Sequence, residues 1–390
     1  MLVPSFKKTS IFFSALTLLT ALFIQPTQAQ VMIPAAPQLA ATAWILIDAH
    51  SGKIITEHNA DKRIPPASLT KMMTSYLLEY ELKQGNVALD DQVRISVKAW
   101  RTPGSRMFIR EGTYVSISDL LRGVIIQSGN DASVAVAEHL AGSEESFADI
   151  MNQHARVMGM KNTQFRNATG LPEENHYSSA RDLAILSRVK ILDYPEHYTI
   201  YSEREFTYNN ITQSNRNRLL WRDNTVDGLK TGHTDDAGYC LAASAEREGM
   251  RLISVVMGAR SDEGRAQESQ KLLTYGFRYF ETTRLYEQYQ VLNNAKIWKG
   301  VGDTVQLGVT EDLYATLPRG HVGDLRAEMQ INTNIKAPIS AGTQLGTLVV
   351  SLGGEIITQK PLVALENIPK AGFFKSLWHS LVMFVVSLFS

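Results

Sequence analysis

Pro65 and Pro66 precede the segment that most constrains how this chain can fold. Proline cannot lie inside a helix but can lead into one, and residues 67–82 contain few helix breakers. The sequence therefore predicts a helix here, with Ser68 in its first turn. Because residues three apart share a helix face, the hydroxyl of Ser68 and the amine of Lys71 should meet. First-turn backbone N–H groups lack a partner inside the helix, so the segment offers a nucleophile, a base and an oxyanion donor.

Length and composition set the class of protein. The chain has 390 residues, which favours two domains. Lys+Arg and Asp+Glu are both 39, and the net charge of zero argues against nucleic acid as a partner. Cys240 is the single cysteine, so no internal disulfide is possible, and we expect it to be a small buried residue rather than a reactive thiol. No two of the nine histidines form an H-x-x-x-H pair, so we expect no metal and no other cofactor.

The first 29 residues have the pattern of a secretory signal. Lys7 and Lys8 give a basic start, residues 11–24 are mostly apolar, and residues 27–29 (Thr-Gln-Ala) form a small-residue cleavage site. A retained membrane anchor is the alternative, but the apolar run is short for one. Residues 30–42, which contain proline and several alanines, should form an extended lead-in.

Both strand and helix patterns occur between residues 43 and 286, and the pattern changes after that. We predict a β-hairpin and then a mainly helical region, and after it a buried strand and a final helix. After residue 285 come short alternating apolar runs separated by Gly and Pro, which predict a small all-β domain at 287–366. The elements expected are strands 44–48, 53–56, 93–97 and 251–258 and helices 118–127, 131–140, 146–158, 179–190 and 267–280.

Three short motifs occur in a fixed order: Ser68-x-x-Lys71, Ser128-Gly129-Asn130 and Lys230-Thr231-Gly232-His233-Thr234. Each alone is weak: the serine could cap a helix, the second could be a loop, and the lysine could be a solvated turn residue. Their joint occurrence is far more specific, since the first should begin a helix, the second should separate two helices and the third should lie at a strand edge.

This combination resembles the penicillin-recognising serine acyl-transferases, and within them the low-molecular-mass D-alanyl-D-alanine carboxypeptidases. Further stretches match that branch: residues 66–74, 104–108, 127–132, 228–234 and 271–277. The resemblance implies a transpeptidase/β-lactamase-like α/β domain, in which helices flank an antiparallel sheet, at 43–286. It also implies a β-rich domain and a C-terminal membrane-associating helix at 371–390. Two departures are a short loop at 100–104, which bears on the rate of deacylation, and Thr169, to which we assign no role, where many members carry His.

The motif residues predict an acyl-enzyme mechanism. Ser68 would attack the carbonyl between two D-alanines, and Lys71 would act as base once its pKa is lowered by the nearby Lys230 and by burial. Ser128 would relay a proton to the leaving amine, and water would release the acyl group. The backbone N–H groups of Ser68 and His233 should form the oxyanion hole.

Substrate binding is predicted for a second set of residues. Asn130 suits the substrate amide, and cations should converge on the terminal carboxylate, with Arg265 added by the resemblance. The alternative for Arg265 is a surface arginine before a helix. The predicted substrate-binding residues are Asn130, Lys230, Thr231, Gly232, His233, Thr234 and Arg265.

The leading hypothesis is a serine-type D-Ala-D-Ala carboxypeptidase that acts on peptidoglycan pentapeptides and is acylated by β-lactams. A β-lactamase is less consistent, because no Glu-x-x-Leu-Asn stretch is present. A DD-endopeptidase would use the same chemistry, and a non-catalytic cell-wall scaffold would not need the intact motifs.

Residues 371–390 predict an amphipathic helix on the periplasmic face of the bacterial inner membrane. At 100° per residue its polar side carries Lys375, Ser376, His379, Ser380 and Ser387, and its other side is mostly apolar. The alternatives are a helix packed on the protein's own β domain and a short transmembrane tail.

Overall fold

A computed structural model describes residues 33–387. The predicted signal at 1–29 lies outside the described residues. Residues 33–42 form no helix or strand, and the carbonyl of Pro34 in this lead-in accepts a hydrogen bond from the hydroxyl of Tyr275.

A five-stranded antiparallel sheet forms the centre of the first region. Its strand order is β2-β1-β9-β8-β7, so the hairpin predicted near the N-terminus lies beside the strand predicted at 251–258. All six residues of β1 are buried, since helices cover both faces of the sheet. The bounds are β1 (Ala43–Asp48), β2 (Ile54–His58), β7 (Val226–Thr234), β8 (Gly238–Arg247) and β9 (Met250–Ala259).

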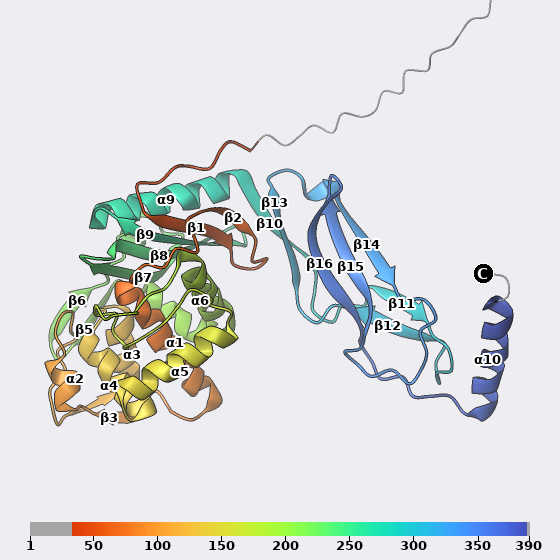
Figure 1. The fold of residues 1–390 in the computed structure, drawn as a ribbon, viewed down its shortest axis with the longest axis horizontal. Helices are drawn as coiled ribbons and strands as arrows, with labels where there is room; N and C mark the ends of the chain where they lie inside the picture. Colours follow the sequence, from red (N-terminus) through yellow and green to blue (C-terminus); the bar gives the residue numbers. More distant parts are fainter. Residues whose placement is uncertain (1–32, 388–390) are drawn as a thin grey trace, which may run out of the picture. The chain divides into compact units, whose positions relative to one another are not determined.

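The mainly helical region is inserted between β2 and β7 and packs on one face of the sheet, while α9 (Asp262–Tyr279) packs on the other (Figure 1). Neighbouring residues of β1 divide between the two cores: Ile45 faces the inserted helices, and Leu46 faces α9. The inserted elements are η1 (Ala67–Thr70), α1 (Lys71–Gln84), β3 (Gln92–Arg94), α2 (Val97–Arg101), β4 (Tyr114–Ser116), α3 (Ile117–Ile125), α4 (Asn130–Ala141), α5 (Glu144–Val157), α6 (Ala180–Asp193), α7 (Pro195–Tyr198), η2 (Thr199–Ser202), β5 (Glu205–Tyr208), β6 (Ile211–Ser214) and α8 (Leu219–Arg222).

Three local predictions differ from the structure. Ser68 lies in the short 3-10 helix η1, and the α-helix begins only at Lys71, because Ala67 has a left-handed φ of 48° that α-helical geometry does not allow. The strand predicted at 93–97 ends at Arg94, since Ser96 caps α2 by accepting the N–H of Ala99. Helix α9 begins at Asp262 rather than 267, with Ser261 as its cap, so Arg265 lies within it rather than before it.

Two antiparallel sheets form the region after α9. Strand β10 (Phe280–Tyr286) continues directly from α9 and pairs with β13 (Leu313–Pro318). A five-stranded sheet has the order β11-β12-β16-β15-β14. The remaining bounds are β11 (Asn293–Lys296), β12 (Thr304–Gly308), η3 (Val322–Asp324), β14 (Leu325–Ile331), β15 (Gln344–Leu352) and β16 (Glu355–Ala364). The predicted fold class is confirmed, whereas the domain boundary at residue 286 stays a prediction.

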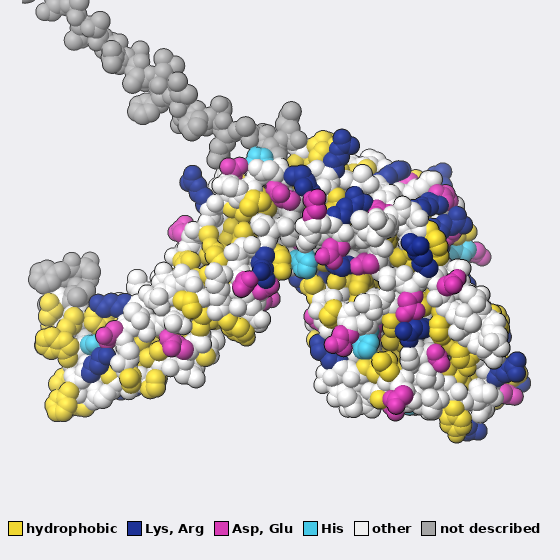
Figure 2. Space-filling model, turned by 180° about the vertical axis from the view of Figure 1, so that it is seen from behind, with side chains coloured by type: hydrophobic (Ala, Val, Ile, Leu, Met, Phe, Trp, Pro, Cys, Tyr) yellow, Lys and Arg dark blue, Asp and Glu magenta, His cyan; other side chains and the backbone are white. Residues whose placement is uncertain are grey.

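Helix α10 (Phe373–Ser387) contacts the rest of the chain through its polar side. Lys375 forms an ion pair with Asp303, and Nδ1 of His379 accepts the backbone N–H of Lys299 at 2.8 Å. The apolar side is exposed, and Figure 2 shows hydrophobic side chains gathered at this helix. The exposed apolar residues are Phe373, Phe374, Leu377, Trp378, Leu381, Phe384 and Val385. Within residues 33–387, no helix combines the length and the apolar character needed to cross a membrane.

Candidate active site

A cavity of about 790 Å³ is lined by residues from all three predicted motifs. The motifs come from separate elements: η1 supplies Ser68, the turn before α4 supplies Ser128, and β7 supplies the third motif. Six predicted site residues line the cavity directly, and Lys71, Asn130 and Lys230 lie next to it through hydrogen bonds. The cavity is lined by Ser68, Gly104, Ser105, Ser128, Ser214, Asn215, Arg216, Arg218, Thr231, Gly232, His233, Tyr239, Asp262 and Arg265.

Lys71 is placed to accept a proton from Ser68. Its Nζ lies 3.1 Å from Oγ of Ser68, 2.7 Å from Oδ1 of Asn130 and 2.5 Å from the carbonyl oxygen of Thr169. An ammonium donates to all three groups. A neutral amine has two N–H donors, which satisfy Asn130 and Thr169, and its lone pair then points to Ser68. The geometry thus suits a general base.

Burial is the main reason that Lys71 can lose its proton. The side chain is 1% exposed, and burial lowers the pKa of Lys71 to about 7, with the positive charge of Arg216 as the second cause. Asp131 and Glu144 oppose this shift. The sequence predicts that Lys230 repels the charge of Lys71, but in the structure burial and then the charge of Arg216 are the main causes of the lowered pKa of Lys71.

Asn130 connects Lys71 to the loop after α2. Its Oδ1 accepts from Lys71, and its Nδ2 donates to the carbonyl oxygen of Pro103 at 2.6 Å. Gly104, the next residue, has no room for a side chain, because a Cβ there would lie 2.6 Å from the same Nδ2. The short loop at 102–105 therefore packs tightly against the second motif.

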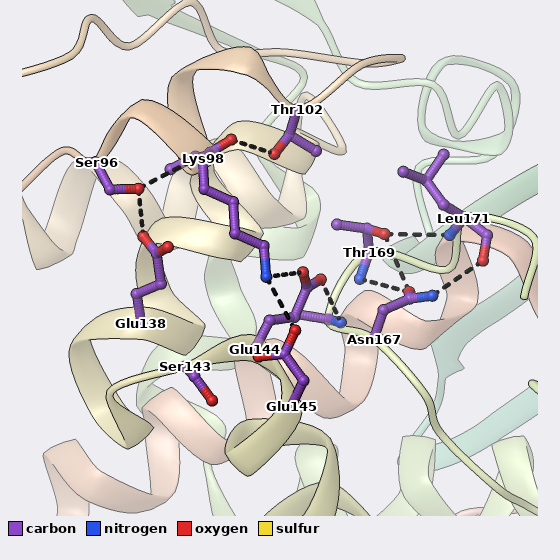
Figure 3. A network of polar contacts seen from close by, with 12 residues as sticks. Ser96, Lys98, Thr102, Glu138, Ser143, Glu144, Glu145, Asn167, Thr169 and Leu171 are labelled. Atoms are coloured by element: carbon purple, nitrogen blue, oxygen red, sulfur yellow. Dashed lines mark hydrogen bonds and ion pairs between the residues drawn. The ribbon is translucent and has the colours of Figure 1, made fainter.

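A second loop, at 167–171, supplies the carbonyl of Thr169 that holds Lys71. The side chain of Asn167 shapes this loop by accepting the backbone N–H groups of Thr169 and Gly170 and by donating to the carbonyl of Leu171 (Figure 3). Gly170 is required there, since its φ is 82° and a Cβ would lie 1.8 Å from the carbonyl oxygen of Ala67.

Glu144 on α5 ties the second loop to α2 (Figure 3). Its carboxylate accepts the backbone N–H of Ala168 and forms an ion pair with Lys98, 3.1 Å away. Just after the end of α2, the hydroxyl of Thr102 donates to the carbonyl of Lys98. Both loops that contact Lys71 and Asn130 therefore share one polar network.

Lys230 contacts Ser128 much as Lys71 contacts Ser68. Its Nζ donates to Oγ of Ser128 at 2.9 Å and to the carbonyl of Thr231 at 3.1 Å. Burial and then the charge of Lys71 hold the pKa of Lys230 well below its usual value. Ser128 has a left-handed φ of 59°, an uncommon conformation that sets its hydroxyl beside this amine.

Strand β7 passes directly beside Ser68. A Cβ on Gly232 would lie 3.0 Å from the carbonyl oxygen of Pro66 and 3.2 Å from the backbone nitrogen of Ser68, so glycine permits this close approach without any shift of the neighbouring backbone. Thr231 and His233 line the cavity on either side. Thr234 does not line it; its hydroxyl accepts the N–H of Ala237 in the turn to β8.

Arg265 is buried at the wall of the cavity rather than on the surface. Its guanidinium donates to the carbonyl of Gly232 at 2.9 Å, pairs with Asp262 and stacks over the ring of Tyr239. It therefore supports β7 as well as lining the site. Cys240 on β8 is buried as predicted, and burial raises the pKa of its thiol to about 11.

Three supporting residues were missed from the sequence. The carboxylate of Asp131 accepts four backbone N–H groups, three of them from residues 107–109, and so holds the segment after Ser105. His176 accepts the N–H of Arg166 at Nδ1, which leaves its Nε2–H to donate to Thr70 at 2.8 Å. Arg216 lines the cavity. The Asn-Asp pair after Ser128-Gly129 was the available signal for Asp131; the other two had none.

Comparison with known proteins decides the family. The model of the peptidase S11 family, D-alanyl-D-alanine carboxypeptidase, matches residues 30–261. The chain belongs to this family. A second model, for the C-terminal domain of penicillin-binding protein 5, matches residues 280–370. The predicted resemblance is thereby confirmed.

Relatives and solved structures agree with this assignment. The chain is 47% identical over 352 residues to the D-alanyl-D-alanine carboxypeptidase DacA of Escherichia coli K12, covering 88% of this chain and 87% of the relative. It is similar to penicillin-binding protein 5 of Haemophilus influenzae, with a TM-score of 0.82 at 44% identity over 86% of this chain and 99% of that one. Penicillin-binding protein D2 of Listeria monocytogenes, solved in its ampicillin-bound form, has a TM-score of 0.58 at 32% identity, over 62% and 99%.

Proposed function

We propose that the protein is a serine-type D-Ala-D-Ala carboxypeptidase that removes the terminal D-alanine from peptidoglycan pentapeptides. The observation that carries this proposal is the contact of 3.1 Å between Ser68 and a buried lysine whose pKa is lowered to about 7. A serine hydroxyl is a weak nucleophile unless a base takes its proton. Family membership adds the substrate class.

Acylation begins when Oγ of Ser68 attacks the carbonyl carbon between the two D-alanines, while Nζ of neutral Lys71 takes the hydroxyl proton. The carbonyl oxygen becomes an oxyanion, stabilised by the backbone N–H groups of Ser68 and His233. Gly232 supports this arrangement, because it lets β7 lie against the backbone of the nucleophile.

The leaving D-alanine amine then takes a proton from the hydroxyl of Ser128, which takes one in turn from the ammonium of Lys230. The carbon–nitrogen bond breaks and the acyl group stays on Ser68. Water then attacks this ester, and its proton passes through Ser128 back to Lys230. The ammonium of Lys71 returns a proton to Oγ of Ser68 as the shortened peptide leaves. Each step uses only side chains and water, so no metal or organic cofactor is required.

Substrate recognition is divided between the two walls. Asn130 and the loop at 102–105 would bind the acyl side, and Thr231, Lys230 and Arg265 would receive the terminal carboxylate, which ion pairs and charged hydrogen bonds favour. Thr234 would act through the β7–β8 turn, since its hydroxyl is engaged there.

Labelling with penicillin tests the proposal. Mass spectrometry should find one adduct on the peptide that contains Ser68, and Ser68→Ala should form none. The purified protein should also release D-alanine from a pentapeptide that ends in D-Ala-D-Ala. An adduct on another serine would overturn the assignment of the nucleophile.

The same preparations separate the rival functions. Cleavage of cross-linked dimers faster than of monomeric pentapeptides would indicate an endopeptidase. Rapid loss of the penicillin adduct would indicate a β-lactamase, and the absence of any adduct would leave only a non-catalytic wall-binding role.

The location we propose is the periplasmic face of the inner membrane. The support is the exposed apolar side of α10, where Phe374 is 86% exposed, together with the polar side held against the β region by Lys375 and His379. A helix packed on its own β domain through its apolar side would have the opposite orientation.

A further inference from the structure

Arg216 differs from the other arginines of the cavity in having no acidic partner within the part of the chain that the structure describes. Arg218 pairs with Asp262 and Glu263, and Arg265 pairs with Asp262. Arg216 lines the same cavity, is exposed, and forms no ion pair with any carboxylate among residues 33–387. Its guanidinium is therefore a charge without a counter-ion inside the site.

The backbone of Arg216 is nevertheless held firmly by its two neighbours. The buried Asn215 donates its side-chain amide to the carbonyl of Tyr201 and of Glu203. The buried Asn217 donates to the carbonyl of Gly228 at 2.9 Å. A long side chain on a pinned backbone loses less freedom when it binds, so this arrangement presents the guanidinium to a ligand.

The charges around Arg216 favour an anion. Burial is the main cause of the lowered pKa values of Lys71, Lys230 and Arg265, and the positive charge of Arg216 lowers each of them further. Among the described residues that line the cavity, only Asp262 carries a carboxylate, and two other arginines already share it. A cation cluster of this kind is relieved by a carboxylate.

Arg265, the expected partner of that carboxylate, is largely occupied. Its Nη1 donates to the carbonyl of Gly232, and its Nη2 pairs with Asp262. An arginine fork binds a carboxylate best when two adjacent N–H groups are free, which is the condition that Arg216 meets.

We propose that Arg216 is a specificity-determining residue that joins Thr231, Lys230 and Arg265 in binding the terminal carboxylate of the substrate. Arg216 supplies the unengaged guanidinium, while Arg265 also supports β7. This inference rests on the proposed carboxypeptidase function. It assigns the discrimination between a free C-terminal carboxylate and a neutral end to a residue outside all three motifs.

The test compares Arg216→Gln, Arg216→Lys and the control Arg222→Gln, which removes an exposed arginine that pairs with Glu263 away from the cavity. Two peptides are used, one ending in D-Ala-D-Ala with a free carboxylate and one with a C-terminal amide. Each variant is assayed at its own pH optimum, so that a change in the pKa of Lys71 does not enter. Benzylpenicillin and its methyl ester provide a second pair that needs only acylation.

Arg216→Gln should lower kcat/KM for the free acid by about ten- to hundredfold, the usual value of a charged hydrogen bond, and change that for the amide by less than about threefold. Arg216→Lys should recover part of the loss, and Arg222→Gln should match the wild type. Acylation by benzylpenicillin should fall far more than acylation by its ester. Equal losses on acid and neutral ligands, or no loss on the acids, would overturn the proposal.

The failure of the proposed function gives a different result. In that case the wild type would release no D-alanine, while the two penicillins would still report whether Arg216 recognises a carboxylate. Thermal unfolding of each variant confirms that the fold is retained.

Discussion

The active-site cavity and helix α10 both depart from the usual distribution of side chains: the cavity region buries charged groups, and α10 exposes apolar ones. The cleft buries two amines, Lys71 at 1% and Lys230 at 3% exposure, whereas α10 exposes Phe374 at 86%. Burial of a charge and exposure of a large apolar surface both disfavour the folded, dispersed protein. Each feature is therefore best explained by a function, and the two functions should be separable by mutation.

The largest effect should come from removing the base in the cleft. Lys71→Ala should reduce acylation by penicillin by a factor of about 10² to 10⁴, the usual contribution of general base catalysis, and leave binding to vesicles unchanged. Stopped-flow acylation and vesicle co-sedimentation measure the two properties. Lys62→Ala, an exposed lysine, serves as the control. Acylation at the wild-type rate would mean that Lys71 is only structural.

The pH dependence of acylation should follow the proton on Lys71. Its pKa is lowered to about 7, and only the neutral amine can act as base. The acylation rate should therefore rise about tenfold per pH unit below pH 7 and level off above it. Arg216→Gln removes a repelling charge, which raises the pKa of Lys71, so the rising limb should move to higher pH. A flat profile between pH 5 and 7 would exclude Lys71 as the base.

A smaller effect should follow from disturbing the loop that holds Lys71. Gly170→Ala places a Cβ 1.8 Å from the carbonyl oxygen of Ala67, which should cost about 1–3 kcal/mol of stability and lower the acylation rate about tenfold as Thr169 shifts. Gly159→Ala is the matched control, because its φ of 80° is almost the same but no atom lies within 4 Å of the new Cβ. Similar changes in both variants, by thermal unfolding and acylation, would show that only the backbone angle matters.

Changes in α10 should have the smallest effect on chemistry. Phe374→Ser with Trp378→Ser should weaken binding to anionic vesicles by at least about tenfold and leave D-alanine release from small peptides unchanged. Val157→Ser, an exposed apolar residue on α5, is the control. Truncation after Lys370 should give a protein that no longer binds vesicles but keeps its activity. Retained vesicle binding by the truncated protein would place the membrane contact elsewhere.

The fold class, the three motifs and the polar side of α10 could be recognised from the sequence, since each depends on the order of neighbouring residues or on their periodicity. Features that depend on the main-chain conformation of residues distant in sequence from the motifs could not be predicted. The carbonyl of Thr169 reaches Lys71 only because Gly170 has a positive φ. Ser68 lies in the 3-10 helix η1 because Ala67 also has a positive φ. Arg216 stands out only in the structure, where the acidic partners of Arg218 and Arg265 can be compared with its own surroundings.

The order of strands in the central sheet also affects how the protein reaches its folded state. Thr42, just before β1, donates its hydroxyl to the carbonyl of Gly258, 216 positions away, and β1 lies between β2 and β9. Contacts between residues so distant in sequence form slowly. The inserted helices can form from local contacts, but β1 cannot complete its pairing until β9 has been synthesised. A nascent chain that stops before residue 250 therefore lacks the strand on which both cores depend.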